Sequence, residues 1–363
     1  MMNAKTRINL ISRNTEEVLT LEDLKKLISS GIKLRHYIGF EISGMIHLGT
    51  GLMSMGKIAD FLKAGVECTI FLADWHTYIN EKLDGQWKTI RKVALAYFKE
   101  GMIASLKCFN VKSGKVNFIL GSDLYKNPIQ WRNLMNVSKH VTLSRVKRSL
   151  NIAGREAKEG IDFAKLIYPP LQVADIFTMK INLAHAGMDQ RKAHVIARKV
   201  AKFLDSPPPV AVHHPLLYGL QKPPVWPIKK LTRKLKISMK MTKSRPETCI
   251  FIHDSPQKIR NKIKSAFCPP KETEYNPIVN WAEHLVFWGG VGELKIKRPA
   301  KFGGIKTYRN INTLEHDYQL GQLHPLDLKN AVADWLIAKL EPARKHFQKE
   351  KPKRGLELIE KIS

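Results

Sequence analysis

The feature of this sequence that most constrains its fold is an alternation of short apolar runs with longer amphipathic stretches, from residue 33 to about residue 215. Such an alternation is typical of an α/β domain in which helices cover a mainly parallel sheet. Helical spacing is clearest in Trp87–Leu106 and Gln190–Leu204. The predicted strands are Leu34–Phe40, Cys68–Ala73, Val116–Leu120, Ile181–Ala184 and Val210–His213. We therefore expect a Rossmann-like, mainly parallel sheet in a domain at residues 33–228.

Two other segments depart from this alternation. Residues 1–32 predict an N-terminal helical segment. A basic stretch at about 122–165, which includes S-R-V-K-R-S-L-N-I-A-G-R-E, predicts a helical insertion between two halves of the sheet. Insertions of this kind often form interfaces.

The composition changes after the predicted sheet. From Leu220 to Ser244 the chain is rich in Pro and Lys, which predicts an exposed, mobile loop, and we place a linker at 229–253. Asp254 or Ser255 then fits the N-cap of a helix, and we expect a mostly α-helical domain over 254–363. A chain of 363 residues is long enough for two domains that each bury a core.

The strongest compositional signal is the charge. The chain has 61 Lys and Arg against 32 Asp and Glu, a net charge of +29, which favours a polyanionic partner. Solubility or an anionic membrane surface are alternatives, but no amphipathic anchor is evident, so nucleic acid is favoured. No apolar run is long enough to cross a membrane, and no signal peptide is evident, so we expect a cytoplasmic protein. The four cysteines are widely spaced and predict neither a disulfide framework nor a zinc site.

One short stretch points to a phosphate. Residues 39–50 read G-F-E-I-S-G-M-I-H-L-G-T, with glycines that allow close approach of the backbone and a helix predicted to start near His47. A helix start offers N–H groups and the positive end of the helix dipole to an anion. The alternative is an ordinary strand-turn-helix connection with a surface histidine. No G-x-G-x-x-G follows the first strand, which disfavours a nicotinamide dehydrogenase and leaves a mononucleotide open.

Two nucleotide motifs and five longer sequence blocks decide between a phosphate site and an ordinary strand-turn-helix connection. H-L-G-T at 47–50 resembles H-I-G-H, and K-M-T-K-S at 240–244 resembles K-M-S-K-S, the paired motifs of class I aminoacyl-tRNA synthetases. The blocks Y-I-G-F-E-I-S-G, L-A-D-W-H-T-Y-I-N, Y-P-P-L-Q-V-A-D-I-F, G-M-D-Q-R-K-A-H and L-H-P-L-D-L-K-N-A-V together resemble the tyrosyl-tRNA synthetases of the archaeal or eukaryotic type. The main rival is a tryptophanyl-tRNA synthetase relative.

The resemblance implies activation of an amino acid by ATP, with Mg²⁺ as counterion and residues 33–228 as the catalytic domain. Positioned cations stabilise the charge that grows on the phosphates. By the resemblance, His47, Thr50, Lys240 and Lys243 are catalytic. The ATP-binding residues are then Gly39, Gly49, Gly187, Asp189, Lys240, Met241, Lys243 and Ser244. The sequence predicts no metal site of protein ligands.

The resemblance also implies a tyrosine pocket. A pocket selects a phenol over a phenyl ring by hydrogen-bonding the hydroxyl, and Tyr37 and Asp175 match the family pair for this task. The complete predicted set is Tyr37, Glu41, His76, Tyr168, Gln172, Asp175 and Gln190. The spacing of Tyr168, Gln172 and Asp175 places them on one face of a helix. Alternatives are a surface acid for Asp175 and a packed core histidine for His76.

A tRNA partner follows from the same resemblance and agrees with the charge. Acceptor-stem contacts are predicted for Arg148, Arg191 and Lys192. Anticodon contacts are predicted for Phe302, His324, Pro325 and Asp327, within a C-terminal anticodon-recognition domain. Helix capping is the alternative for Asp327. The resemblance further implies a homodimer with an interface at the 122–165 insertion.

Two positions depart from the family pattern. Ile42 stands where proline is usual, and Thr50 stands where the second histidine of H-I-G-H is common. A lost charge-assisted hydrogen bond at Thr50 costs transition-state binding about 1.5–3 kcal/mol if nothing compensates. Three hypotheses therefore remain: a tyrosine-activating enzyme, a tryptophan-activating relative, and a tRNA-binding protein that has lost catalysis.

Overall fold

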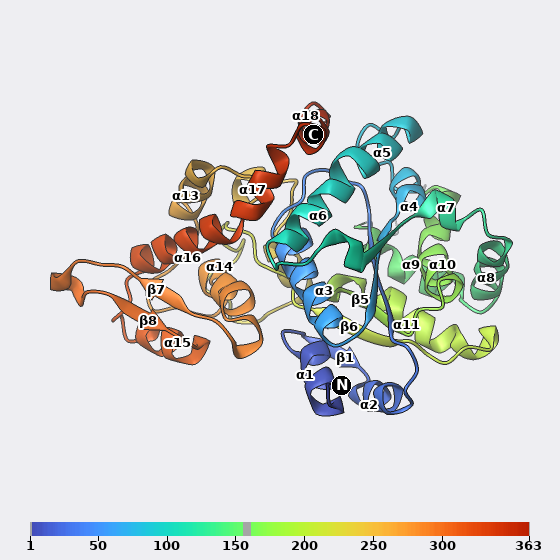
Figure 1. Ribbon diagram of the computed structural model, residues 1–363, viewed down its shortest axis with the longest axis horizontal. Helices are drawn as coiled ribbons and strands as arrows, with labels where there is room; N and C mark the ends of the chain where they lie inside the picture. Colours follow the sequence, from blue (N-terminus) through green and yellow to red (C-terminus); the bar gives the residue numbers. More distant parts are fainter. Residues whose placement is uncertain (1, 155–160, 363) are drawn as a thin grey trace.

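The computed structural model describes residues 2–154 and 161–362 (Figure 1). At its centre is a six-stranded sheet with the order β1-β6-β5-β2-β3-β4. Strands β2 to β6 run parallel to their neighbours, and β1 pairs antiparallel with β6 at one edge. The bounds are Glu17–Leu19 (β1), Arg35–Phe40 (β2), Glu67–Leu72 (β3), Val116–Leu120 (β4), Leu183–Gly187 (β5) and Val210–His214 (β6). This order and direction confirm the Rossmann-like α/β fold.

All the predicted strands are present, and most of their bounds agree within a residue or two. Strand β5 begins later than predicted and continues to Gly187. Strand β1 was not predicted, because three residues are too few to show an alternating pattern. Its position depends on pairing with a distant segment, since Val18 lies opposite Val212. The N-terminal segment therefore contributes an edge strand between its helices α1 (Ala4–Ser12) and α2 (Leu21–Ser29).

The two faces of the sheet are covered by different helices, because successive side chains of a strand point to opposite faces. Ile38 and Ile70 belong to the core that includes residues of α3 and α6, whereas Tyr37 and Phe71 belong to the core that includes residues of α8, α10 and α11. The bounds are Ser54–Lys63 (α3), Lys99–Lys107 (α6), Pro128–Lys139 (α8), Phe163–Thr178 (α10) and Arg191–Val200 (α11).

The two helical runs predicted inside this domain are confirmed, each with an irregular turn. The first consists of α5 (Trp87–Val93), a π-helical turn (Ala94–Phe98) and α6. In the second, α11 is followed by a 3₁₀ turn (Ala201–Leu204).

The predicted insertion is mostly helical in the residues that the structure describes. It contains α7 (Gly121–Leu124), α8 and α9 (Leu143–Ser149), and it lies between β4 and β5 as expected. Residues 155–160, which end the basic stretch of the insertion, lie outside the described residues.

The prediction of a loop throughout Leu220–Ser244 is wrong for its second half. Helix α12 (Arg233–Met239) begins after Thr232, whose side chain accepts the backbone N–H of Leu235. Leu235 and Met239 are buried one helical turn apart. The dense lysines hid this apolar spacing in the sequence.

The C-terminal region is mostly helical, as predicted, and Ser255 caps its first helix. It also contains a small hairpin of β7 (Leu294–Ile296) and β8 (Lys306–Tyr308), which was not predicted. The helices are α13 (Pro256–Lys264), α14 (Pro277–Trp281), α15 (Ile311–Gln319), α16 (Pro325–Lys339), α17 (Glu341–Phe347) and α18 (Glu350–Glu360). No described helix has the length and apolar character that a membrane crossing requires.

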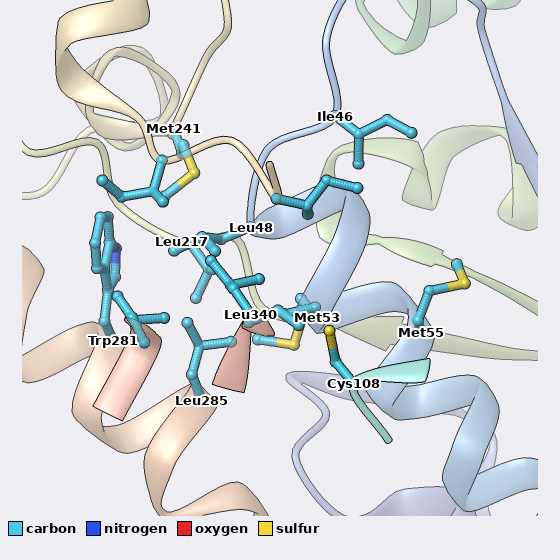
Figure 2. Packing of buried hydrophobic residues seen from close by; sticks show 14 of the residues in the cluster. Ile46, Leu48, Met53, Met55, Cys108, Leu217, Met241, Trp281, Leu285 and Leu340 are labelled. Atoms are coloured by element: carbon cyan, nitrogen blue, oxygen red, sulfur yellow. The ribbon is translucent and has the colours of Figure 1, made fainter. Parts of the chain in front are cut away.

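One hydrophobic cluster joins this region to the Rossmann-like domain. Figure 2 shows Leu48 and Met53 near α3 facing Trp281 and Leu285 of the C-terminal region, with Met241 beside them. The four cysteines are free and buried, in agreement with their predicted lack of disulfides. The segment that carries K-M-T-K-S is thus anchored where the two parts meet.

Candidate active site

The residues predicted to bind ATP and tyrosine lie at the point where the strand order of the sheet reverses. Strands β2 and β5 are neighbours, and the connections from their carboxyl ends lead to opposite faces of the sheet. In such folds ligands bind in the crevice at this point. The loop after β2 carries Glu41 and His47, and a 3₁₀ turn after β5 (Met188–Gln190) carries Asp189.

His47 is held as a neutral hydrogen-bond donor. Its Nδ1 accepts the backbone N–H of Gly49 at 3.1 Å, so the proton of the neutral ring lies on Nε2. Burial, with a further contribution from Lys243, lowers the pKa of His47 to about 3. The Thr50 hydroxyl lies 3.5 Å from Nε2, so both groups face one region. A Cβ atom at Gly49 would lie 3.0 Å from the His47 ring, which explains the glycine there.

A helix does begin at this point, with a π-helical turn at Gly49–Met53 followed by α3. Its first N–H groups are partly used within the turn, because Gly49 donates to the His47 ring and Gly51 donates to the His47 carbonyl. These N–H groups are therefore not free for an anion, and the His47 side chain contributes more to an anion site here than the helix start does.

The K-M-T-K-S segment lies directly against this crevice. Lys240 forms an ion pair with Asp189, and Lys243 Nζ donates to the Ser43 hydroxyl at 2.5 Å. Met241 is buried, and its backbone N–H donates to the Leu217 carbonyl at 2.8 Å. Ser244 is exposed at the end of the segment. Met241, which lies between the two lysines in the sequence, is thus the anchor that places both ammonium groups beside His47.

The electrostatics of these lysines differ. Burial lowers the pKa of Lys243 to about 8, although Glu41 acts in the opposite direction. Burial tends to raise the pKa of Asp189, but Lys240 outweighs it, so the carboxyl has a lowered pKa and stays ionised. Gly44 has a φ of +117° and packs under Lys243, where an added Cβ would lie 3.2 Å from its Cδ. The glycine allows the turn that lets Lys243 reach Ser43.

The predicted tyrosine-site residues form a second, adjoining group. The rings of His76 and Tyr168 are 4.6 Å apart in an edge-to-face arrangement, and His76 Nε2 lies 3.8 Å from Asp175 Oδ2. Gln172 Nε2 donates to Gln190 Oε1 at 3.3 Å. Asp175 is 1% exposed, so the alternative of a surface acid is wrong. His76 is indeed buried in the core, yet it also faces the Asp175 carboxylate.

Burial sets the protonation of this group. It lowers the pKa of His76 to about 3 and raises the pKa of Asp175 well above its ordinary value, against the hydrogen bonds from Tyr125 and Gln130. It also raises the pKa of Glu41, whose Oε1 accepts the Asn80 amide at 2.7 Å.

Several polar atoms of this group have no hydrogen-bond partner among the described residues. They are Asp175 Oδ2, His76 Nε2 and Gln172 Oε1, all buried. Buried polar atoms normally find partners, so unpaired ones that share a small region indicate a polar ligand. Two hollows of about 910 and 400 Å³ lie elsewhere, against α13, and no predicted site residue lines them. The unpaired atoms, not the size of a void, therefore identify the site.

Comparison with known proteins decides the family. A family model described as tRNA synthetases class I (W and Y) matches residues 30–341. A tyrosine–tRNA ligase of Thermococcus sibiricus is 52% identical over 373 aligned positions, covering 99% of each chain. The crystal structure of tyrosyl-tRNA synthetase complexed with L-tyrosine from Pyrococcus horikoshii gives a TM-score of 0.96 at 51% identity, covering 99% of this chain and 100% of that chain.

The chain belongs to the tyrosyl-tRNA synthetase family. It is therefore an aminoacyl-tRNA synthetase, an enzyme of a class that uses ATP as substrate, as its motifs predicted. A tryptophanyl-tRNA synthetase from Aeropyrum pernix gives a TM-score of 0.67 at 16% identity, covering 95% of this chain and 85% of that chain, which shows a common fold only. The tryptophan rival is thus not favoured.

Sequence reasoning missed four residues that support the site of this synthetase. Ser43 receives Lys243, Asn80 holds Glu41, and Tyr125 and Gln130 contact Asp175. Asn80 was visible as the last residue of the L-A-D-W-H-T-Y-I-N block, four residues after His76. Gln130 carried no signal, because only the packing of α8 on α10 brings it to Asp175.

The predicted acceptor-stem residues lie together, and two of them have protein partners. Arg191 forms a two-pronged ion pair with Glu17 of β1, with 2.8 Å contacts from Nε and Nη2. Lys192 donates to the carbonyl of Arg148, whose side chain is exposed on α9. Their role toward tRNA stays a prediction.

The predicted anticodon residues lie in the C-terminal region, Phe302 in a short 3₁₀ turn and the other three at the start of α16. Phe302 is 61% exposed. His324 is the N-cap of α16, and its Nδ1 accepts the Leu326 N–H at 3.2 Å. Asp327 lies in the first turn of that helix, so the capping role proposed as its alternative belongs to His324. The anticodon role of all four residues stays a prediction.

Proposed function

We propose that this chain activates L-tyrosine with ATP to form tyrosyl-adenylate and pyrophosphate, and then transfers the tyrosyl group to tRNA(Tyr). The observation that carries the choice of amino acid is the unpartnered Asp175 Oδ2 beside the unpartnered His76 Nε2. A phenolic hydroxyl satisfies such a pair, whereas a phenyl ring leaves both atoms unpaired, and tyrosine against phenylalanine is the well-known case of this selection.

The first step needs the tyrosine carboxylate to attack the α-phosphorus of ATP in line with the departing pyrophosphate. Tyr168, Gln172 and Gln190 hold the ammonium group of tyrosine, and Asp189 accepts the ribose hydroxyls of ATP. His47 donates its Nε2–H to the phosphates, and the Lys240 and Lys243 ammonium groups stabilise the charge on the leaving pyrophosphate. The Thr50 hydroxyl adds a donor beside His47.

Mg²⁺ enters this reaction with ATP. Among residues 2–154 and 161–362, no group of three His, Cys, Asp or Glu side chains is placed to hold a metal ion. We infer that the ion is held mainly by the ATP phosphates and supplies positive charge there.

The charge and the exposed side chains of the protein support the second step, transfer to tRNA, and the assembly of a homodimer. A net charge of +29 supports binding of tRNA phosphates. We place the acceptor stem near Arg148, Arg191 and Lys192 and the anticodon near Phe302, His324, Pro325 and Asp327. Exposed Trp131 and Met135, one turn apart on α8, favour a homodimer through the insertion, in the cytoplasm where tRNA is charged.

The experiment that tests the proposal is ATP–pyrophosphate exchange with each standard amino acid supplied separately. We expect exchange with tyrosine and little with phenylalanine, and we expect Asp175→Ala to lose that preference. Exchange with tryptophan instead would overturn the choice of amino acid. No exchange with any amino acid would favour a tRNA-binding protein without catalysis.

A further inference from the structure

The carboxylate of Asp175 is not equally free on its two sides. Oδ1 accepts the Gln130 side-chain N–H at 2.8 Å, in a buried contact. Oδ2 has no partner and lies 3.8 Å from His76 Nε2, which has none either. One oxygen is therefore used within the protein, and the other is left for a ligand.

Gln130 is placed for this contact by the first turn of α8. The helix begins after Asn127, which caps it, and the Gln130 backbone N–H donates to the Asn127 carbonyl at 3.0 Å. The Gln130 side chain is fully buried. Trp131, the next residue, donates its indole N–H to the Tyr125 carbonyl at 3.0 Å. This turn therefore positions Gln130 itself and, through the Trp131 indole, the backbone at Tyr125.

We propose that Gln130 is a positioning residue for tyrosine selection: its amide N–H fixes Asp175 through Oδ1 and so presents Oδ2, beside His76 Nε2, to the substrate phenol. This inference rests on the proposed tyrosine activation. A carboxylate with one bonded oxygen has a defined plane, whereas a free carboxylate rotates about its last bond.

The chemical type of the side chain that bonds to Asp175 matters as much as its position. A lysine or arginine at this position would neutralise Asp175 and compete with the phenol for its charge. An amide donates a hydrogen bond and brings no net charge, so Oδ2 keeps its strength as an acceptor. Gln130 thus orients Asp175 without weakening the acceptor that selects tyrosine.

The test uses Gln130→Met, which keeps the length of the side chain and removes the donor. In tyrosine-dependent ATP–pyrophosphate exchange we expect the KM for tyrosine to rise about tenfold or more, the range for a hydrogen bond to a charged group. The ratio of kcat/KM for tyrosine over phenylalanine should fall by a similar factor. The KM for ATP should stay within about twofold, because the ATP contacts are unchanged.

The matched control is Asn133→Leu on the same helix. Asn133 donates to the Thr178 hydroxyl of α10 at 3.0 Å, so this variant also removes a side-chain bond between α8 and α10 but leaves Asp175 alone. We expect it to keep the tyrosine KM and the selection ratio. Thermal unfolding of both variants reports any general loosening.

A second variant, Gln130→Glu, keeps the size and polarity but turns the donor into an acceptor, and it should impair tyrosine KM at least as much as Gln130→Met. Variants at Gln130 that keep the wild-type tyrosine KM and selection would overturn the inference while leaving the proposed activity intact. So would an equal loss in Asn133→Leu. A wild-type protein without tyrosine-dependent exchange would overturn the proposed function and this inference with it.

Discussion

In its proposed role, the single residue Asp175 combines a cost in stability with the selection of tyrosine. Its carboxyl is buried with one oxygen unpaired, and burial raises its pKa above that of an unfolded aspartate. Above the unfolded pKa of about 4, the unfolded chain releases this proton more readily than the folded chain does. Ionisation of Asp175 therefore destabilises the ligand-free fold as the pH rises.

We accordingly predict that Asp175→Asn stabilises the ligand-free protein near pH 7 while it abolishes selection of tyrosine. The amide keeps the oxygen that accepts from Gln130 and cannot ionise, so the cost that the raised pKa of Asp175 imposes on folding disappears, a gain of about 1–3 kcal/mol. Thermal unfolding at pH 7 should show a higher midpoint than wild type, and the difference should vanish below about pH 3, where Asp175 is protonated in both the folded and the unfolded chain. A lower midpoint at pH 7 would contradict this account of the pKa.

Lys243 provides a prediction for activity. Burial lowers its pKa to about 8, and the proposed stabilisation of pyrophosphate requires its ammonium group to be charged. The charge is present below that pH and is lost above it, so kcat/KM for ATP should fall as the pH rises through about 8. His47, neutral down to about pH 3, should add no step between pH 5 and 8.

A pH profile of pyrophosphate exchange checks both statements. Lys243→Arg keeps the charge at all these pH values and should move the alkaline decline out of range. A decline at the same pH in Lys243→Arg would assign it to another group.

At the scale of elements, the segment around K-M-T-K-S depends on one buried side chain. Met241 is 1% exposed and packs beside Leu217 and Trp281 in the cluster that joins the two parts of the chain (Figure 2). We predict that Met241→Ala lowers the free energy of unfolding by about 2–5 kcal/mol, the usual cost of such a truncation. Denaturant unfolding measures this, with exposed Ser244→Ala as a control that should match wild type.

Elements also show what a sequence can and cannot predict. Strands β2, β3, β4 and β6 were predicted because their apolar runs are local, whereas β1, β7 and β8 have only three residues each, too few for an alternating pattern. Helix α12 was missed because lysines surround its two buried apolar residues.

In the candidate site, too, the residues that share a local sequence pattern were the ones predicted. Asp175, Gln172 and Tyr168 were found through one motif on one helix, α10. Gln130 reaches the site from α8, and no spacing within the sequence reveals that contact. Motifs therefore predicted the residues with proposed substrate roles, but not Gln130, whose contact depends on the packing of two helices.

At the scale of the molecule, the proposed homodimer gives a prediction for α8. Met135 is 61% exposed on this helix, and a charge there would be buried without a partner in an apolar interface. Met135→Glu should shift the molar mass in solution from that of a dimer toward that of a monomer, measured by light scattering. Leu320→Glu, at a side chain 54% exposed on the C-terminal region, should leave the mass unchanged.

The net charge of +29 belongs to the whole molecule, and its consequence is a difference between the two steps of the reaction. Binding of tRNA releases counterions from many phosphates, whereas tyrosine and ATP bring few charges. We predict that between about 50 and 200 mM salt the KM for tRNA in aminoacylation rises about tenfold or more. Tyrosine-dependent pyrophosphate exchange should change far less over that range, because it needs no tRNA. Equal salt dependence of the two assays would show that the basic surface does not serve tRNA binding.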